Sequence, residues 1–351
     1  MRALLLEHHG EPEAVLQLVD LPMPEPGPGE VRVRMRLSPV NPSDFNTIRG
    51  GYQRSLERVI WNHGATQLHF DPGRARALAS LPVSPGADGM GVVEAAGSGW
   101  FARRLLGKRV IVMAAPSGNW REQVVLPAMQ AMPVPSGVSD EQAAMFLVNP
   151  LTAWAMVNHV LRVPAGTWLL QSGGASQLAR MVIRLGKRQG FRTINLVRRA
   201  EVAEELRALG ADEVIDTGSE DLIARVASIT ANSGVRYALD CVGADTLALM
   251  LRCLAPGAHL VCYGSLGGDA LNFPVRDLMS PAARIEGFLL PQWIAGQSLL
   301  GRLRATRRVG RLIADGILSS EVGQTYPLEQ FREALAQSTR PGRGGKVLLA
   351  F

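Results

Sequence analysis

Cysteine is scarce in this sequence: only Cys241, Cys253 and Cys262 occur among 351 residues, and no two form a C-x-x-C pair. A structural zinc site needs four Cys or His ligands, so the ligand count excludes one, and three thiols do not favour a disulfide framework. All three lie in an apolar region, which predicts small buried core residues. His63 and His69 could in principle bind a metal in a shared loop. Loop histidines without a metal are more common, and we expect no metal.

Long apolar runs are also absent. No window approaches the roughly 18–20 uninterrupted apolar residues of a membrane span. The first residues, MRALLLEHHGEPE, contain a three-leucine run and then turn acidic, which is typical of neither a signal peptide nor a transit peptide. Apolar residues make up 47% and charged residues 19%, an ordinary globular composition that argues against disorder. We therefore predict a cytoplasmic protein with no membrane partner, long enough for two domains.

The net charge of +6 comes from arginine far more than from lysine. No Lys/Arg block is interleaved with aromatic residues, so nucleic acid is not the favoured partner. The densest basic cluster falls at helical spacings: Arg302, Arg304, Arg307, Arg308 and Arg311. A solvated helix face is the common explanation of such a run, and docking of an acidic partner or a phosphorylated substrate is the functional alternative.

The stretch from residue 167 to residue 199 reads TWLLQSGGASQLARMVIRLGKRQGFRTINLVRR. An apolar run ends at small residues, apolar side chains then recur at helical spacing up to Gly190, and a second apolar run follows. This pattern predicts a strand, a tight turn, a helix and a strand, the unit that places a helix N-terminus where a pyrophosphate binds. The G-x-G-x-x-G fingerprint is absent, so the interpretation needs support from elsewhere in the chain.

The rest of the chain shows two kinds of pattern. Up to residue 126, short alternating runs predict an antiparallel β domain, with a short helix that starts at an N-cap Ser43 and ends at Gly50 and Gly51. From residue 139 to residue 162 the pattern is helical. Residues 53–83 have no clear period and predict a long loop or lid. From residue 163 to residue 263, strands and helices alternate, which predicts a doubly wound parallel sheet. The predicted domains are 1–148 plus 289–351, and 149–288.

Several short motifs, taken in order, resemble those of the zinc-free branch of the medium-chain dehydrogenase/reductases, which contains quinone oxidoreductases and 2-enoyl-thioester reductases. They are NPSDFNTIRGGY at residues 41–52, NPLTA at 149–153, TINLVR at 193–198, CVG at 241–243, YG at 263–264, GFLLPQW at 287–293 and a lysine at 346. The resemblance covers nearly the whole chain except the 53–83 insertion. It implies an α/β protein with a GroES-like β-rich catalytic domain and a doubly wound parallel-sheet (Rossmann) cofactor domain. It also implies a homodimer.

The resemblance bears on metals and on the reaction. Zinc-bearing relatives have a cysteine after the first strands and a Gly-His-Glu run later, whereas this sequence has NPSD at 41–44 and GADG at 86–89. An alcohol dehydrogenase mechanism would then lack its Lewis acid. Reduction of a conjugated C=C bond needs a hydride at the β carbon, a stabilised carbonyl oxygen and a proton at the α carbon. The resemblance places the proton-donating tyrosine of enoyl-thioester reductases at Tyr52, and an ordinary loop aromatic is the alternative.

For the cofactor, the resemblance implies contacts from residues in separate parts of the sequence. They are Asn41, Asn149, Gly173, Gly174, Ala175, Ser176, Gln177, Leu178, Tyr263, Gly264, Ser265, Phe288 and Lys346. Trp293 would line the acyl pocket or pack in the core. Gln177 and Ala179 stand where quinone-oxidoreductase relatives have glycine, and a structural turn that no longer binds nucleotide is the alternative.

The second strand of the 167–199 unit ends in Arg198 and Arg199, where an NAD enzyme has an acidic residue for the ribose 2′-hydroxyl. A guanidinium pair suits a 2′-phosphate, which predicts NADPH; surface arginines are the alternative. The predicted function is NADPH-dependent reduction of an activated C=C bond, on a 2-enoyl thioester of coenzyme A or acyl-carrier protein. A quinone or enone reductase, and a cofactor-binding protein with lost catalysis, are the alternatives.

Overall fold

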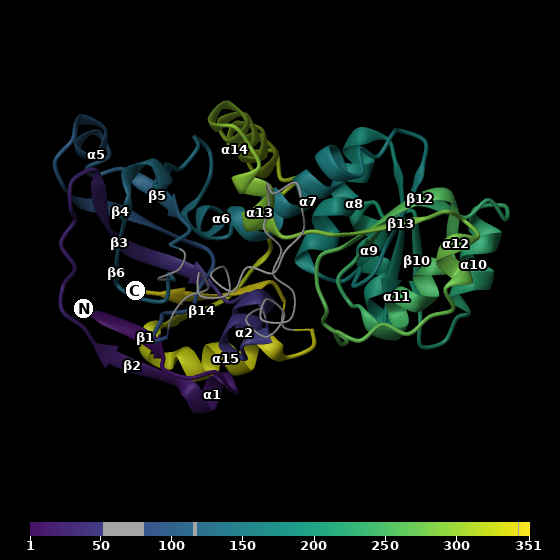
Figure 1. Ribbon diagram of the computed structural model, residues 1–351, viewed down its shortest axis with the longest axis horizontal. Coiled ribbons are helices and arrows are strands. Elements are labelled where there is room, and N and C mark those ends of the chain that lie inside the picture. Colours follow the sequence, from purple (N-terminus) through teal and green to yellow (C-terminus); the bar gives the residue numbers. More distant parts are fainter. Residues whose placement is uncertain (52–80, 115–117, 343) are drawn as a thin grey trace, which may run out of the picture. The chain divides into compact units, whose positions relative to one another are not determined.

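The computed structural model describes residues 1–51, 81–114, 118–342 and 344–351. The chain divides into two compact units (Figure 1). Unit 1 contains Met1–Val148 and Ser320–Phe351, and unit 2 contains Asn149–Ser319. Unit 2 is therefore an insertion between two segments that fold together.

Unit 1 is built mainly from antiparallel strands. Its strands are β1 (Arg2–Leu6), β2 (Leu16–Asp20), β3 (Glu30–Pro39), β4 (Gly89–Ala96), β5 (Arg109–Val112), β6 (Gln123–Pro127), β7 (Met132–Pro133), β14 (Val322–Pro327) and β15 (Lys346–Ala350). Its helices are α1 (Pro12–Val15), α2 (Pro42–Ile48), α5 (Trp100–Arg104), η1 (Ala128–Gln130), α6 (Asp140–Ala144), η5 (Leu328–Gln330) and α15 (Phe331–Thr339).

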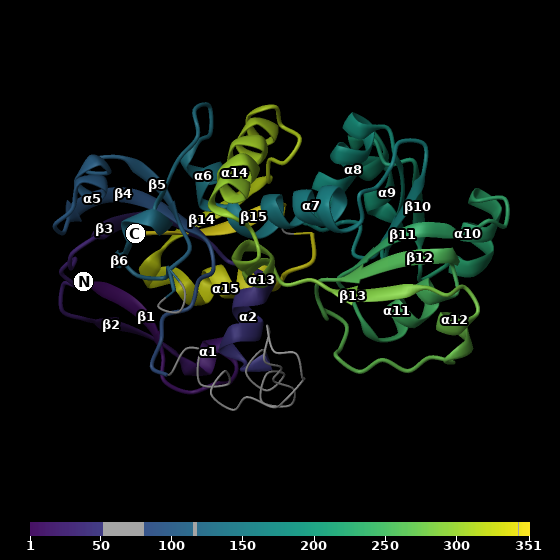
Figure 2. The same ribbon diagram turned by 45° about the horizontal axis from the view of Figure 1, so that its top comes forward.

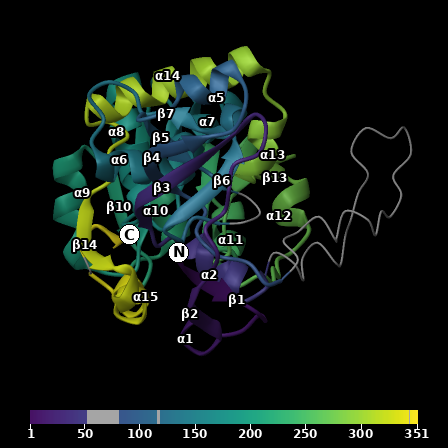
Figure 3. The ribbon, with the colours of Figure 1, turned by 90° about the vertical axis from the view of Figure 1, so that its left-hand side faces the viewer.

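Strand β3 organises the main sheet of unit 1. The described strands follow the order β14-β15-β3-β4-β5-β7. Strand β6 also pairs with β3, and Figure 3 shows the two side by side. Val31, Val33 and Met35 alternate along β3, so all three side chains lie on one face and are buried in the core. On the other edge of β3, Leu348 of β15 pairs with Pro39, which joins the last segment of unit 1 to the first.

Unit 2 alternates strands and helices. Its strands are β8 (Trp168–Gln171), β9 (Arg192–Val197), β10 (Glu213–Asp216), β11 (Val235–Asp240), β12 (Leu254–Cys262) and β13 (Arg284–Gly287). Its helices are α7 (Thr152–Ala155), η3 (Met156–Val160), α8 (Gln177–Gln189), η4 (Ala200–Val202), α9 (Ala203–Leu209), α10 (Leu222–Ile229), α11 (Ala244–Leu251), α12 (Arg276–Met279), α13 (Leu290–Ala295) and α14 (Leu299–Ala314), and the π-helical turn η2 (Leu147–Leu151) spans the boundary between the units.

The sheet of unit 2 is parallel, with the strand order β10-β9-β8-β11-β12-β13. Helix α8 packs with α9 and α10 packs with α11, and Figure 2 shows α8 and α9 on one face of the sheet with α11 on the other. The chain therefore winds away from β8 in both directions, which confirms the predicted doubly wound sheet. Its strands are apolar on both faces because helices cover both faces, as Leu170, Ile194 and Leu260 illustrate, each fully buried.

Two sequence predictions differ from the structure. The N-cap of α2 is Asn41, not Ser43, because Asp44 accepts a hydrogen bond from the Asn41 N–H and completes a capping box. The chain returns to unit 1 at Ser320 rather than at residue 289. Helix α14 buries Val309 and Ile313, and the Arg184 guanidinium of α8 donates hydrogen bonds to the carbonyl oxygens of residues 317 and 319, so this segment stays with unit 2.

The predicted insertion 53–83 lies almost entirely outside the described residues. In the part of the chain that is described, no helix is long and apolar enough to cross a membrane.

Candidate functional site

The turn between β8 and α8 has the geometry of a close backbone approach. Gly173 has a φ of +60°, and a Cβ there would lie 2.6 Å from the Cys241 sulfur. A Cβ on Gly174 would lie 3.0 Å from the Cβ of Asn195. A side chain would clash at Gly173 and would be tightly packed at Gly174, so both positions favour glycine and present bare backbone.

Helix α8 begins directly after this turn. Its N-cap is Ser176, whose Oγ accepts the Ala179 N–H at 3.1 Å. Gln177 is the first helical residue, and Ala179 is fully buried. The two residues that replace family glycines thus leave the helix N-terminus intact, and its dipole favours an anion at this position.

Asp240, the last residue of β11, fixes this turn through hydrogen bonds. This buried carboxylate accepts a hydrogen bond of 2.6 Å from the Ser172 hydroxyl. It also accepts the N–H groups of Val242 at 3.1 Å and Gly243 at 2.8 Å. One side chain therefore holds the loops that follow two adjacent strands, β8 and β11. Asp240 and Ser172 are not among the residues predicted from the sequence, although a charged residue that ends an apolar strand is a usable signal.

Most predicted cofactor residues of unit 2 follow the carboxyl ends of parallel strands. Tyr263, Gly264 and Ser265 follow β12, and Phe288 follows β13. A Cβ on Gly264 would lie 2.9 Å from the Cys241 carbonyl oxygen, so this loop also packs tightly on the β11 loop. The carboxyl ends of parallel strands share one edge of the sheet, and a ligand crevice forms where the winding reverses, here between β8 and β11.

Arg198 and Arg199 follow β9 at the same edge. Both are exposed, and no carboxylate in the described part of the chain forms an ion pair with either. Their guanidinium groups are therefore available to an external anion. By contrast, Arg180 of α8 is buried and pairs with Glu205 of α9 at 2.6 Å, which is a structural contact.

In unit 1 the structure brings together two other predicted residues, Asn41 and Lys346. The buried Lys346 ammonium group donates a 2.5 Å hydrogen bond to Asn41 Oδ1. Asn41 Nδ2 is buried as well, and none of the described residues supplies an acceptor for it. An unpaired buried donor is costly, so this atom is a good point of contact for a ligand oxygen.

Two buried carboxylates lie beside this pair. Asp44 accepts the N–H groups of Asn41 and Ala87, and Asp88 accepts those of Leu147 and Val148. Both lie in the segments 41–44 and 86–89 that the sequence comparison set beside the zinc-ligand segments of zinc-bearing relatives. Here each carboxylate has both oxygens occupied by backbone donors and serves as a cap.

Burial is the largest influence on the pKa values of Asp44 and Asp88. It raises the pKa of Asp44 to about 6, although the backbone donors and Lys346 oppose the shift. It raises the pKa of Asp88 to about 7, and the nearby Asp44 charge adds to that rise. The Lys346 ammonium group lowers the pKa of both carboxyl groups and so partly offsets the effect of burial.

The remaining predicted residues have different surroundings. Trp293 of α13 packs edge-on against Trp154, with ring centroids 6.3 Å apart, and against His159 at 5.6 Å. Asn149 lies in η2 as the first residue of unit 2. Tyr52, His63 and His69 lie outside the described residues.

The cysteines are free thiols, two buried and one partly buried, as expected for core residues. Burial raises the pKa of Cys253 and Cys262 to about 12. It also raises the pKa of the Tyr263 phenol well above its usual range. Tyr263 is therefore suited to donate a hydrogen bond rather than to ionise.

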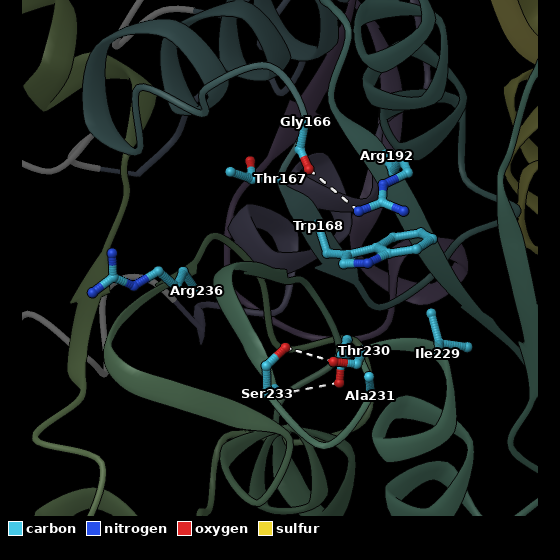
Figure 4. Close-up of a pocket in the computed structure, with 10 residues that line it drawn as sticks. Gly166, Thr167, Trp168, Arg192, Ile229, Thr230, Ala231, Ser233 and Arg236 are labelled. Atoms are coloured by element: carbon cyan, nitrogen blue, oxygen red, sulfur yellow. Dashed lines mark hydrogen bonds between the residues drawn. The ribbon is translucent and has the colours of Figure 1, made fainter.

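A separate pocket of about 420 Å³ opens at the opposite edge of the unit 2 sheet (Figure 4). It is lined by residues at the amino ends of β8, β9 and β11, including Trp168, Arg192 and Arg236. The Arg192 guanidinium lies over the Trp168 ring at 4.0 Å, so this side chain is already engaged. The pocket is remote from the loops that carry the predicted cofactor residues, and we do not assign the site to it.

Comparison with known families divides the chain in the same way as the structure does. Residues 27–136 match the alcohol dehydrogenase GroES-like domain, and residues 178–304 match the zinc-binding dehydrogenase domain. The second match covers α8 and the strands β9 to β13 of the parallel sheet.

Individual relatives cover the whole length of the chain. The mitochondrial enoyl-[acyl-carrier-protein] reductase of Bos taurus is 30% identical over 356 residues, which covers 99% of this chain and 88% of that protein. Among solved structures, a putative NADPH:quinone reductase from Bacillus thuringiensis is 28% identical with a TM-score of 0.87, covering 100% of this chain and 98% of the other. The Escherichia coli quinone oxidoreductase complexed with NADPH is 25% identical with a TM-score of 0.83, and both chains are fully covered.

Proposed function

This chain belongs to the medium-chain dehydrogenase/reductase family and is an oxidoreductase, and we propose that it uses NADPH to reduce the C=C bond of a 2-enoyl thioester. The observation that carries the proposal is the free guanidinium pair, Arg198 and Arg199, at the carboxyl edge of a nucleotide-binding sheet. The relatives named as enoyl reductases support the substrate class.

The described residues fit NADPH. The bare backbone at Gly173 and Gly174 and the N-terminus of α8 suit its pyrophosphate, and the two arginines suit a 2′-phosphate. In unit 1, Asn41 Nδ2 offers a buried donor without a protein acceptor among the described residues. We propose that it donates to an oxygen of the cofactor, and that Lys346 orients the Asn41 amide by holding its Oδ1. When bound, NADPH supplies the hydride.

We further propose that the reaction needs no zinc. Asp44 and Asp88 use both of their oxygens as acceptors for backbone N–H groups. The described residues contain no cluster of three or more His, Cys, Asp or Glu side chains that could hold a metal. The enolate oxygen that forms when a hydride reaches the β carbon must then be stabilised by hydrogen-bond donors.

Tyr52 is the proposed proton donor at the α carbon. The helix that precedes it in the sequence, α2, is capped at Asn41 by Asp44 and ends at Ile48, and Gly50 after it has a φ of +71°. A Cβ on Gly50 would lie 2.8 Å from the His9 ring, so only glycine fits this exit from the helix. The backbone therefore leaves α2 in a fixed direction two residues before Tyr52. A homodimer and a cytoplasmic location also belong to the proposal.

The direct test is oxidation of NADPH followed at 340 nm with crotonyl-CoA and with longer 2-enoyl-CoA thioesters. We expect turnover with the thioesters and a much slower reaction with NADH. The quinone-reductase relatives among solved structures favour one competing function, reduction of quinones or enones. Turnover of 1,4-benzoquinone without any turnover of thioesters would replace the proposal by that alternative.

Removal of the guanidinium pair should convert the cofactor preference. In Arg198→Ala/Arg199→Ala, the KM for NADPH should rise roughly 10- to 100-fold, because a hydrogen bond to a charged group contributes about 1.5–3 kcal/mol and 1.4 kcal/mol is tenfold. The KM for NADH, which lacks the 2′-phosphate, should change little. The control is Arg188→Ala, an exposed arginine in the last turn of α8. An equal rise in KM for both cofactors would show that the arginine pair does not recognise the 2′-phosphate.

A further inference from the structure

We propose that the outer face of α14 is a docking surface for a negatively charged acyl-carrier protein, so that the enoyl thioester arrives on a carrier rather than on free coenzyme A. The inference rests on the proposed function and names the form of its substrate. The surface, which we call the α14 stripe, consists of Leu300, Leu303, Arg304, Arg307 and Arg311.

The stripe is a continuous face of one helix. Residues 300, 304, 307 and 311 follow each other at spacings of three and four, which places their side chains in one row. All five members of the stripe are exposed, and Leu300 is 63% exposed. The opposite face of α14 carries Ala305, Val309, Leu312 and Ile313, which are buried.

The charge of the stripe is not compensated. The segment from residue 287 to residue 314 contains five arginines and no Asp or Glu. Across the described residues, none of these arginines forms an ion pair, whereas Arg180, Arg225 and Arg284 of the same unit each pair with a glutamate. An uncompensated row of guanidinium groups raises the local concentration of an acidic partner and speeds its association.

Leu300 and Leu303 indicate which class of acidic partner fits the α14 stripe. A lipid surface would require a broad apolar face free to enter the acyl chains, but Ala305, Val309, Leu312 and Ile313 of α14 are buried. A nucleic acid would use the arginines and leave Leu300 and Leu303 exposed to water. An acidic protein surface with apolar side chains among its carboxylates can pair with the arginines and also cover the two leucines. Protein interfaces combine a buried apolar centre with a polar rim in this way.

The experiment compares two substrates with the same acyl group, crotonyl-CoA and crotonyl-acyl-carrier protein, on the full chain. In Arg304→Glu/Arg307→Glu/Arg311→Glu, kcat/KM for the carrier thioester should fall roughly 10- to 100-fold, with crotonyl-CoA kinetics unchanged. Leu300→Ser/Leu303→Ser should also lower kcat/KM for the carrier thioester at unchanged charge. The matched control is Arg103→Glu/Arg104→Glu/Lys108→Glu, which reverses three exposed charges in unit 1.

Direct titration of the protein with butyryl-acyl-carrier protein separates this inference from the proposed function. If neither thioester is turned over, the proposed function fails, but carrier binding that is lost in the arginine variant alone still supports the docking surface. An equal fall in kcat/KM for both thioesters would show that the arginines do not act on the carrier alone, for example by binding the phosphates of coenzyme A. That result would overturn the inference. It is also overturned if the arginine variant behaves like its control, or if the wild-type protein binds phosphatidylglycerol vesicles or duplex DNA but not the carrier.

Discussion

Replacement of Tyr52 by phenylalanine is expected to lower kcat for a 2-enoyl thioester by roughly 10²- to 10⁴-fold, the range that general acid catalysis contributes. Phenylalanine keeps the ring and removes only the hydroxyl group, so the loss reports the proton given to the α carbon or the hydrogen bond to the enolate oxygen. The dissociation constant of NADPH should stay the same, because the phenol is not among the proposed cofactor contacts. Steady-state oxidation of NADPH and a fluorescence titration measure the two quantities.

Tyr326→Phe is the matched control for this change. The Tyr326 hydroxyl of β14 donates to Gln324 Oε1 at 2.6 Å, a local contact within unit 1. Loss of that hydroxyl should leave both kcat and the dissociation constant of NADPH unchanged. Wild-type turnover in Tyr52→Phe would assign the proton to another donor, and the function would then rest on the cofactor residues alone.

Lys346→Met is expected to destabilise the protein by about 3–5 kcal/mol above pH 7, the range measured when one partner of a buried charge group is removed. The variant would leave Asp44 and Asp88 ionised without their cation and would take the donor from Asn41 Oδ1. The free energy of unfolding from urea denaturation at pH 8 is the measurement. Lys108→Met, which removes an exposed lysine from the same unit, should change this free energy little.

The destabilisation should depend on pH in a defined direction. The folded-state pKa values of about 6 for Asp44 and about 7 for Asp88 lie above the value of about 3.9 for an unfolded aspartate. The folded state therefore binds protons more tightly, and the stability that these carboxyl groups contribute is present at low pH and lost as pH rises through 6 and 7. The deficit of Lys346→Met should accordingly be smaller at pH 5 than at pH 8. A deficit that does not change between the two pH values would show that Lys346 does not compensate these carboxylates.

The nucleotide-binding unit was largely readable from the sequence because its signals are local. An apolar strand, a small-residue turn and an amphipathic helix lie within residues 167–199, and the structure forms β8, α8 and β9 there. The deviations in the fingerprint, Gln177 and Ala179, are accommodated because Ser176 caps the helix and Ala179 packs in the core. Periodicity carries such information well because it depends on neighbours along the chain.

The contacts that hold the site together were not readable in the same way. The hydrogen bond between Ser172 and Asp240 joins residues 68 positions apart in the sequence, and the one between Lys346 and Asn41 joins residues 305 positions apart. No local pattern specifies such pairs. The domain boundary illustrates the same limit, because α13 and α14 carry no mark that assigns them to unit 2. The assignment follows from contacts such as the two hydrogen bonds from Arg184.

The discontinuity of unit 1 has a consequence for how the protein is made. During translation, β3, Asp44 and Asp88 are synthesised first and all of unit 2 follows. The strand β15, which carries Lys346, is synthesised only after that. Unit 2 can complete its sheet during synthesis, since all its strands are then available. Until β15 pairs with β3, unit 1 has an open strand edge and two buried-site carboxylates without their cation. We therefore expect the final folding step to coincide with the arrival of that one lysine, so the nascent β domain would depend on chaperones for longer than the nucleotide-binding unit.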